Sequence, residues 1–338
     1  MKVFIFASDV ASYIGQNKWD YLTPFERLWK KCDTNCYNEL VNQVENKVDM
    51  VLDEISGLDQ QRVELQSQLD DGTITDQQYL QRRSELASET NNKKRTVDNL
   101  KTRLEDTVKS QKEILETVVG KDLVEKIQVD TQTDTREKRN LIEKAIEASD
   151  VPEPRKRVLQ REAESFVNKS HGTLKEMGAI EIFCNQFDVE LDTSQTFFTR
   201  KLPTNDTGGF EWYIGGKLDG IHKDYIVEVK NRTQKFFNRI REYEKTQIHM
   251  YMYITQTSEA KLVESLGDKI RVTHVMRDPD YLDDILQRLV SFLEIFENEF
   301  LRNIQIKTNY VEASAQTRKA MLGKLFFEKE QVDAVCLI

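Results

Sequence analysis

Asp219, Glu228 and Lys230 are residue types that bind metal ions and transfer protons, and they lie close together in the sequence. Glu228 and Lys230 alternate with Val227 and Val229, so in a β-strand the charged side chains would share one face. Two carboxylates and the backbone carbonyl of Val229 are hard oxygen ligands that suit Mg²⁺ or Mn²⁺. Such an ion polarises a phosphoryl oxygen and activates bound water, so the pattern predicts hydrolysis of phosphodiester bonds.

Lys230 would orient the attacking water or stabilise the charge that develops in the transition state. The same residue types in an exposed hairpin would form only an ordinary salt bridge. The surroundings favour the catalytic interpretation, because the three residues lie in apolar strands between predicted helices. Gly215, Gly216 and Gly220 beside them leave room for a backbone or a phosphate to approach closely.

The elements that must position these residues predict an α/β core with a central mixed sheet flanked by helices. Strands are expected where β-branched and aromatic residues cluster, at 187–191, 196–200, 212–218, 225–230 and 269–275. A helix after residue 154 has an apolar face and is interrupted or kinked at His171-Gly172. Further helices are expected at 239–254 and at about 281–300.

Residues 37–150 predict a helical insertion into this core. Apolar residues follow a 3-4 alternation from Val41 to Leu69, which is typical of a coiled-coil seam. A break around Gly72 separates this series from a second, more polar one that ends at Gly120. The economical arrangement is an antiparallel coiled-coil hairpin. Partner contact, oligomerisation, guidance of DNA and a plain structural spacer are all compatible with it. The expected domains are therefore 1–36, 37–150, 151–300 and a helical tail at 301–338.

The composition is that of an acidic, highly charged chain, with a formal net charge of -9 and 32% charged residues among 338. Net negative charge argues at first against a nucleic-acid partner. Residues 230–245 are nevertheless locally basic, because Glu242 and Glu244 are the acidic residues among them. The cations of this stretch are Lys230, Arg232, Lys235, Arg239, Arg241 and Lys245. An ordinary solvated helix face would explain it equally well. The chain has neither an apolar run long enough to span a membrane nor a secretory signal, so we expect an intracellular protein.

Several segments together resemble the YqaJ-type viral recombinases and lambda-type exonucleases of the PD-(D/E)XK nuclease superfamily. The segment from His171 to Glu176, with Ala179 beyond it, resembles the family's Gly-Thr-x-x-Glu-x-x-Ala helix. The opening is similar to the family's first motif at Ser8, Asp9, Gly15, Tyr21, Pro24 and Trp29. Tyr243 and Gln247 match the helix that follows the catalytic lysine, and residues 277–280 match the closing segment.

The resemblance implies a restriction-endonuclease-like fold and a metal-dependent DNA nuclease. It implies Mg²⁺ or Mn²⁺ bound by Asp219, Glu228 and Glu176, with Lys230 as the catalytic lysine and Gln247 beside the active site. His171 is a further candidate metal ligand, although a histidine at a helix end is the commoner use. The expected contacts to nucleic acid are Ser8, Arg232, Lys235, Arg239 and Tyr243. Ser8 would cap a helix that holds a terminal phosphate, or would be a plain cap.

The activity that the resemblance implies is 5′-to-3′ exonucleolysis of duplex DNA with a free end, in viral or phage recombination or end processing. An endonuclease or an RNA-cleaving enzyme would use the same site. A non-catalytic coiled-coil scaffold is a different class of protein, and the intact set of Asp219, Glu228 and Lys230 argues against it. We expect no membrane partner; the coiled coil offers a surface for a second copy or a recombination protein. A viral origin would place the protein in the host cytoplasm or nucleus.

Overall fold

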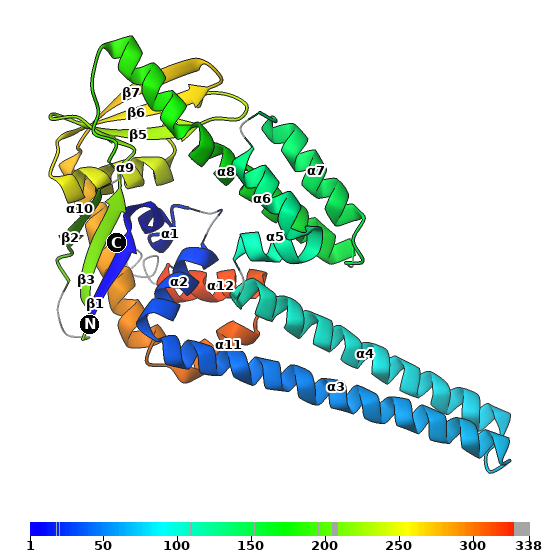
Figure 1. Ribbon diagram of the computed structural model, residues 1–338. Coiled ribbons are helices and arrows are strands. Elements are labelled where there is room, and N and C mark those ends of the chain that lie inside the picture. Colours follow the sequence, from blue (N-terminus) through cyan, green and yellow to red (C-terminus); the bar gives the residue numbers. More distant parts are fainter. Residues whose placement is uncertain are drawn as a thin grey trace, which may run out of the picture. The chain divides into compact units, whose positions relative to one another are not determined.

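The computed structural model describes the chain except for residues 18, 20, 109, 131, 152, 195, 205–208 and 328–338. Most of the described chain is helical, and the strands form two mixed sheets (Figure 1). The chain divides into two compact units. The first, unit 1, comprises Met1–Cys32, Ser110–Arg302 and Gly323–Ile338, and the second, unit 2, comprises Asp33–Lys109 and Asn303–Leu322. Within the described residues, no helix combines the length and apolar character needed to cross a bilayer.

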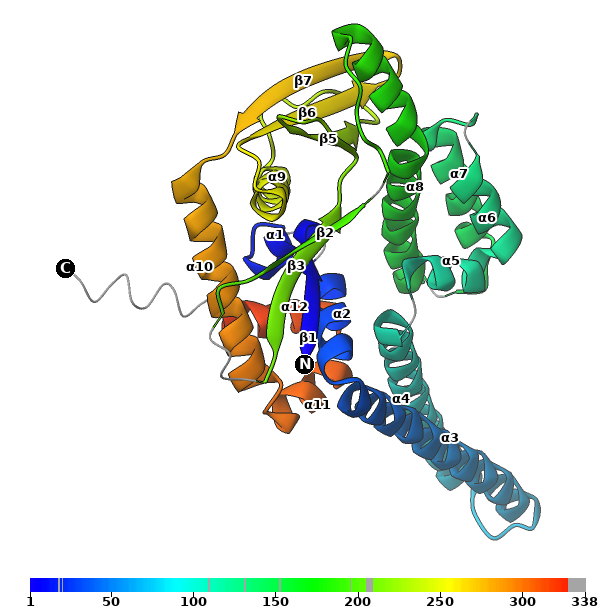
Figure 2. The ribbon, with the colours of Figure 1, turned by 60° about the vertical axis from the view of Figure 1, so that its left-hand side comes forward.

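Unit 2 is built on two long helices, α3 (Thr34–Asp70) and α4 (Asp76–Val108), which lie side by side (Figures 1 and 2). The predicted break at Gly72 is confirmed, because this glycine has φ +73° in the turn between the helices. Residues that face one another across the pair include Leu58, Leu65 and Leu86. The helices α11 (Ile304–Glu312) and α12 (Ala315–Phe326) lie within the segment predicted as a helical tail, and the end of that segment lies outside the described residues.

The second apolar series does not form one helix up to Gly120. Ser110 caps a new helix, α5 (Gln111–Val119), by accepting a hydrogen bond from Glu113, so the prediction of a continuous helix there is wrong. The helices α6 (Lys121–Val129) and α7 (Thr135–Glu147) follow. All three pack on the first half of α8 (Glu153–Phe187) and belong to unit 1. Their shared core contains the predicted apolar face of α8, which is Leu159, Ala163, Phe166 and Val167.

A three-stranded sheet in unit 1 has the order β1-β3-β2. Its strands are β1 (Lys2–Phe6), β2 (Phe197–Lys201) and β3 (Glu211–Lys217). β1 runs parallel to β3, and β2 runs antiparallel to it. Side chains alternate between the two faces of this sheet, and one face is buried. The residues on the buried face are Val3, Ile5, Trp212 and Ile214, each at most 2% exposed. β1 was not predicted, because the sequence analysis did not assign a strand to the short apolar start of the chain.

A four-stranded sheet in unit 1 has the order β4-β5-β6-β7. Its strands are β4 (Gly220–Ile221), β5 (Ile226–Asn231), β6 (Glu259–Leu266) and β7 (Lys269–Met276). β5 is a central strand, antiparallel to β4 and parallel to β6. The chain passes from the first sheet to this one through Leu218 and Asp219, so two sheets replace the single central sheet that the sequence predicted.

Helix α9 (Glu242–Thr255) contacts strands of both sheets and lies between them in Figure 2. Helix α10 (Pro279–Ile295) is capped by Asp278, whose side chain accepts the Tyr281 N–H, and a π-helical turn, η2 (Phe296–Phe300), continues it. The expected strand at 187–191 is absent, since α8 reaches Phe187 and an irregular connection follows. α8 is also one continuous helix through His171-Gly172, so of the two predicted alternatives, an interruption or a kink, the interruption is wrong.

Candidate active site

Strand β5 places Glu228 and Lys230 on the face that looks toward α9. The alternate residues Val227 and Val229 pack on the other face with residues of α8 that include Phe183. Burial on both faces is expected for a strand that has neighbours on both edges and helices on both sides. The Glu228 side chain is only 4% exposed, whereas the Lys230 side chain is 24% exposed and reaches solvent. The predicted division of this strand into a charged face and a core face is therefore confirmed.

The Lys230 ammonium is held by two oxygen atoms from different elements. It donates hydrogen bonds to Glu228 Oε1 at 2.6 Å and to Gln247 Oε1 on α9 at 3.0 Å. Gln247 is oriented in turn, because its Nε2 donates to the Tyr251 hydroxyl one helical turn later, at 3.3 Å. Gly216 makes room for this tyrosine, since a Cβ there would lie 2.6 Å from the Tyr251 ring. Burial disfavours a charged lysine, but the pKa of Lys230 is raised overall by Glu228 and, more weakly, by Asp219 and Glu244.

Asp219 lies in the bend between β3 and β4, not within a strand as the sequence analysis expected. Gly220 pairs with Val227, so Asp219 is the next residue along toward Glu228. Its Oδ2 accepts the backbone N–H of Val229 at 2.6 Å. Burial, Glu228 and Glu176 raise the pKa of Asp219 to about 8, with Val229 N–H and Lys230 acting in the opposite direction. Asp219 therefore keeps its proton to a higher pH than an ordinary aspartate does.

Helix α8 brings Glu176 within electrostatic range of Asp219, as its effect on the Asp219 pKa shows. The helix is anchored to β5 by Asn231, whose Nδ2 donates to the carbonyl oxygen of Gly172 at 2.8 Å. The structure therefore joins Glu228, Lys230 and Gln247 through direct hydrogen bonds, and it holds Asp219 beside them on the Val229 N–H. Glu176 acts electrostatically on Asp219. Asn231 and Tyr251 also belong to this arrangement, and the sequence analysis did not single them out.

The carboxylates of this site are the candidate ligands for Mg²⁺. In the part of the chain that the structure describes, no group of three or more Asp, Glu, His or Cys side chains is arranged to hold a metal ion as it stands. Mg²⁺ retains several waters and is commonly bound by only one or two carboxylates together with substrate phosphates. Asp219 and Glu228 fit that requirement, because their mutual repulsion in a buried site would be relieved by a cation.

His171 is half-buried on α8, and its surroundings are cationic. Burial, Lys175 and Lys138 all lower the pKa of His171, so the charged groups that act on it are lysines rather than the site carboxylates. A lowered pKa keeps imidazole neutral, as a metal ligand must be, but no carboxylate is among the groups that act on this pKa. Metal ligation by His171 therefore stays a prediction without a structural argument.

Ser8 does not cap a helix. It lies within the 3₁₀ turn η1 (Ala7–Asp9), and neither Phe6 nor Asp9, which precede this turn and the short helix α1 (Val10–Tyr13), makes a side-chain cap. The prediction that Ser8 caps a helix is wrong, because Ser8 lies inside a tight turn. Its contact with nucleic acid stays a prediction. Ser8 remains exposed.

Arg232 was predicted to contact nucleic acid, but its guanidinium serves an internal network. It bonds Glu244 through two nitrogens at 2.7 and 2.9 Å and Glu264 through Nε at 2.8 Å. The Arg232 side chain is 9% exposed, and Arg271 on β7 also bonds Glu264. This network, defined as Arg232, Glu244, Glu264 and Arg271, joins the end of β5 to α9, β6 and β7. We assign Arg232 a structural role in place of the predicted one.

The rest of the basic stretch is partly used within the protein. Arg241 lies 3.8 Å from the Phe237 ring, and Lys245 lies 3.6 Å from the Tyr281 ring. Lys235 and Arg239 are exposed and remain available as predicted contacts to nucleic acid. Tyr243 is half-buried; burial and Glu244 raise its pKa, and Arg241, Arg232 and Lys230 act in the opposite direction. Tyr243 therefore lies within electrostatic range of Lys230.

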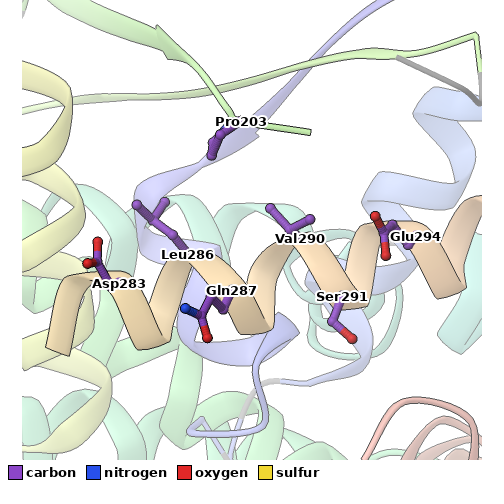
Figure 3. A pocket seen from close by; sticks show the side chains of 7 residues that line it. All are labelled: Pro203, Asp283, Leu286, Gln287, Val290, Ser291 and Glu294. Carbon is purple, nitrogen blue, oxygen red and sulfur yellow. The ribbon is translucent and has the colours of Figure 1, made fainter. Parts of the chain in front are cut away.

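A hollow of about 410 Å³ lies apart from these residues, along α10 (Figure 3). Pro203 faces the helix across it, and the helix contributes Asp283, Leu286, Gln287, Val290, Ser291 and Glu294. None of these lining residues belongs to the set around Asp219 and Lys230. The hollow is open and acidic at both ends, which does not suit a phosphate group.

Comparisons with known proteins gave structural neighbours only. No protein-family model matches the chain, and no curated protein matches it. The crystal structure of SSO0001 has a TM-score of 0.31 at 17% identity, covering 52% of this chain and 85% of that one. An alkaline exonuclease, LHK-Exo from Laribacter hongkongensis, has a TM-score of 0.30 at 13% identity, covering 58% and 90%. The same exonuclease in complex with dAMP has 0.28 at 14%, covering 57% and 89%. TM-scores this low do not establish a shared fold.

Proposed function

We propose that this protein is a metal-dependent nuclease that hydrolyses phosphodiester bonds of DNA at Asp219, Glu228 and Lys230. The observation that carries the proposal is the Lys230 ammonium, held between Glu228 and Gln247 at the edge of a buried pair of carboxylates. A lysine in a plain surface salt bridge would have neither a 4% exposed partner nor a second, oriented acceptor on another helix.

The chain's own residues divide the work. Asp219 and Glu228, with the Val229 carbonyl, would hold Mg²⁺ or Mn²⁺, and Glu176 would add negative charge from α8. Bound there, the ion would polarise a phosphoryl oxygen and lower the pKa of a water ligand. Lys230 keeps its proton, because its pKa is raised, and can donate a hydrogen bond to the attacking water or to the phosphoryl oxygens. Gln247 positions Lys230 by accepting a hydrogen bond from its ammonium group.

More specifically, the proposed activity is 5′-to-3′ exonucleolysis of duplex DNA that has a free end, in viral or phage recombination. It rests on the sequence resemblance at residues 171–179 and 243–247, not on the geometry of the site. The PD-(D/E)XK classification rests on the same resemblance, whereas the coiled-coil insertion is proposed from the 3-4 alternation of apolar residues between Val41 and Leu69. Exposed Lys235 and Arg239, on the segment between β5 and α9, are the proposed phosphate contacts.

The test is cleavage of four substrates by the full chain with Mg²⁺, with Mn²⁺ and with EDTA. End-labelled linear duplex, circular duplex, single-stranded DNA and a matched RNA are compared. Loss of label from linear duplex alone, abolished by EDTA, is the expected result. Nicking of circles would replace the exonuclease with an endonuclease, and cleavage of RNA alone would change the substrate. Absence of metal-dependent cleavage on all four would contradict the proposal and favour a scaffold organised by α3 and α4.

A further inference from the structure

The three-stranded sheet has a second face, opposite the one that is buried against the core of unit 1. Phe4 and Phe6 of β1, Tyr213 of β3 and Phe197 of β2 occupy its alternate positions. Phe6 is 37% exposed and Phe197 is 42% exposed, and the other two rings are half-buried. Four aromatic side chains on three adjacent strands therefore form one surface, the aromatic face.

The rings on this face lie next to one another. The Phe4 and Tyr213 ring centroids are 5.3 Å apart, and those of Phe6 and Phe197 are 6.3 Å apart. Phe197 reaches across β3 to Phe6 because Gly215 lies beneath it: a Cβ at Gly215 would lie 2.7 Å from the Phe197 ring. A side chain at position 215 would thus displace Phe197 and divide the aromatic face in two.

Cations border the aromatic face in a chain that is acidic overall. Lys2 lies 5.6 Å from the Tyr213 ring, and Lys31 of α2 (Leu22–Cys32) lies 5.7 Å from Phe4 and 5.9 Å from Phe6. Lys201 and Lys217 occupy exposed positions on the same side of β2 and β3. Glu211 is the acidic residue on these strand positions, opposite Lys2. Positive charge is therefore concentrated here despite the net charge of -9.

We propose that the aromatic face binds single-stranded nucleic acid, with bases stacked on Phe6 and Phe197 and phosphates near the lysines. Aromatic platforms bordered by cations hold unpaired bases without regard to sequence, because every base offers a flat π-face. A duplex cannot use such a platform, since its bases are already stacked. A protein partner is a poorer match, because the cores of protein interfaces are depleted in lysine.

This proposal rests on the proposed nuclease function and extends it. β3 leads from Lys217 through Leu218 directly to Asp219, so the aromatic face ends where the candidate active site begins. A strand held there would have one end beside the carboxylates. The face would thus retain the unpaired strand that enters or leaves the site.

The test measures binding without metal, so that it does not depend on cleavage. Fluorescence anisotropy in EDTA follows a labelled oligothymidylate of about twenty nucleotides, longer than the site of one binding module. We expect the double variant Phe6→Ala/Phe197→Ala to bind at least about tenfold more weakly than wild type, since each lost stacking contact weakens binding severalfold. Phe187→Ala is the matched control, because Phe187 is also 42% exposed but lies at the end of α8. It should bind like wild type.

A strand of abasic nucleotides carries the same phosphates without bases. Wild type should bind it at least about tenfold more weakly than oligothymidylate, and the double variant should not weaken that binding further. Phe6→Tyr/Phe197→Tyr, which keeps both rings, should bind oligothymidylate like wild type. Oligouridylate distinguishes the two sources of such a strand: tighter binding of thymidylate identifies DNA, tighter binding of uridylate identifies RNA, and either result supports the face.

Three outcomes would overturn the proposal. One is equal binding by the double variant and Phe187→Ala, and another is equal binding of abasic and base-bearing strands by wild type. The second comparison uses wild type alone, so it is valid even if thermal melting shows that the double variant is not folded. A change of sedimentation coefficient in the double variant would instead identify a second copy of the chain on this face. If the double variant loses binding but wild type cleaves no substrate, the proposal for the aromatic face stands and the proposed nuclease function fails.

Discussion

Lys230 donates a 2.6 Å hydrogen bond to Glu228, which precedes it by two residues on the same strand and is almost completely buried. Residues in this relationship point to the same side of a strand, but they form a contact this short only when the lysine bends back along it. Gln247 on α9 provides the second acceptor and holds that conformation. The consequence is a cation with a fixed position beside two carboxylates.

The variant Glu228→Gln keeps the shape of the side chain and removes its charge. We expect cleavage to fall at least about 100-fold, because a metal ligand and the principal partner of Lys230 are lost together. Initial rates with Mn²⁺ and calorimetric titration of Mn²⁺ measure the two effects. Glu259→Gln on β6 is the matched control, since its carboxylate pairs with His274 outside the site. Unchanged Mn²⁺ affinity in Glu228→Gln would remove Glu228 from the metal ligands.

Gln247 is a positioning residue, so its loss should affect turnover more than substrate binding. The variant Gln247→Met fills a similar volume, but its thioether sulfur is only a weak acceptor for the Lys230 hydrogen bond. We expect kcat to fall about tenfold with KM unchanged. Gln247→Glu retains an acceptor and should recover most of that loss. If Met and Glu behave alike, the hydrogen bond to Lys230 does not matter for turnover.

Arg232 should contribute to stability and not to affinity for nucleic acid. Arg232→Met leaves Glu244, which is 1% exposed, without the partner it bonds through both oxygens. Breaking one side of a buried ion pair costs about 3–5 kcal/mol, so the free energy of unfolding should fall by that order. Urea denaturation measures it. Lys235→Ala is the converse variant: it should leave stability unchanged and weaken DNA binding. Weakened DNA binding in a fully stable Arg232→Met would restore the original prediction.

The raised pKa of Asp219 makes the metal-free protein less stable as pH rises. The folded state holds a proton on Asp219 up to about pH 8, whereas the unfolded chain releases it near the ordinary value of about 4. Between these values the folded state binds more protons, so stability falls with increasing pH. We expect wild type in EDTA to lose at least about 1 kcal/mol between pH 5 and pH 8.5 relative to Asp219→Asn. Parallel pH profiles of the two proteins would contradict the shift.

The same shift links metal binding to protons. A cation that binds Asp219 must displace its proton, so Mn²⁺ affinity should rise with pH and level off above about pH 8. Calorimetry in two buffers with different ionisation enthalpies should detect release of about one proton per ion at neutral pH. An affinity that does not change from pH 6.5 to pH 8.5 would exclude Asp219 as a ligand.

The motif residues could be predicted because their geometry is local. Alternation along one strand determines the faces of Glu228 and Lys230, and the short hairpin before them brings Asp219 close whatever the rest of the fold does. The spacing of Gln247 on a helix facing this strand was supplied by the resemblance, and the Lys230 hydrogen bond agrees with it.

The role of Arg232 could not be predicted, because its partners come from separate elements. The basic stretch was counted against Glu242 and Glu244 alone, while Glu264 lies on β6, a strand that the sequence analysis did not identify. β6 is followed by a turn at Gly267 and pairs in parallel with β5, a register that only the tertiary fold determines. The start of a new helix after Ser110 was missed for a simpler reason. The capping box of Ser110 and Glu113 lies within an apolar series whose spacing is helical on both sides of it.

The central claim is that Lys230 acts in hydrolysis, and one comparison tests it most directly. Lys230→Ala and Lys223→Ala remove lysines from the same hairpin, but only Lys230 reaches Glu228 and Gln247. Both variants are assayed on end-labelled linear duplex DNA with Mg²⁺, after circular dichroism has shown equal folding. We predict at least about a 100-fold lower rate for Lys230→Ala and a wild-type rate for Lys223→Ala. Wild-type cleavage by a folded Lys230→Ala protein would contradict the assignment of this site.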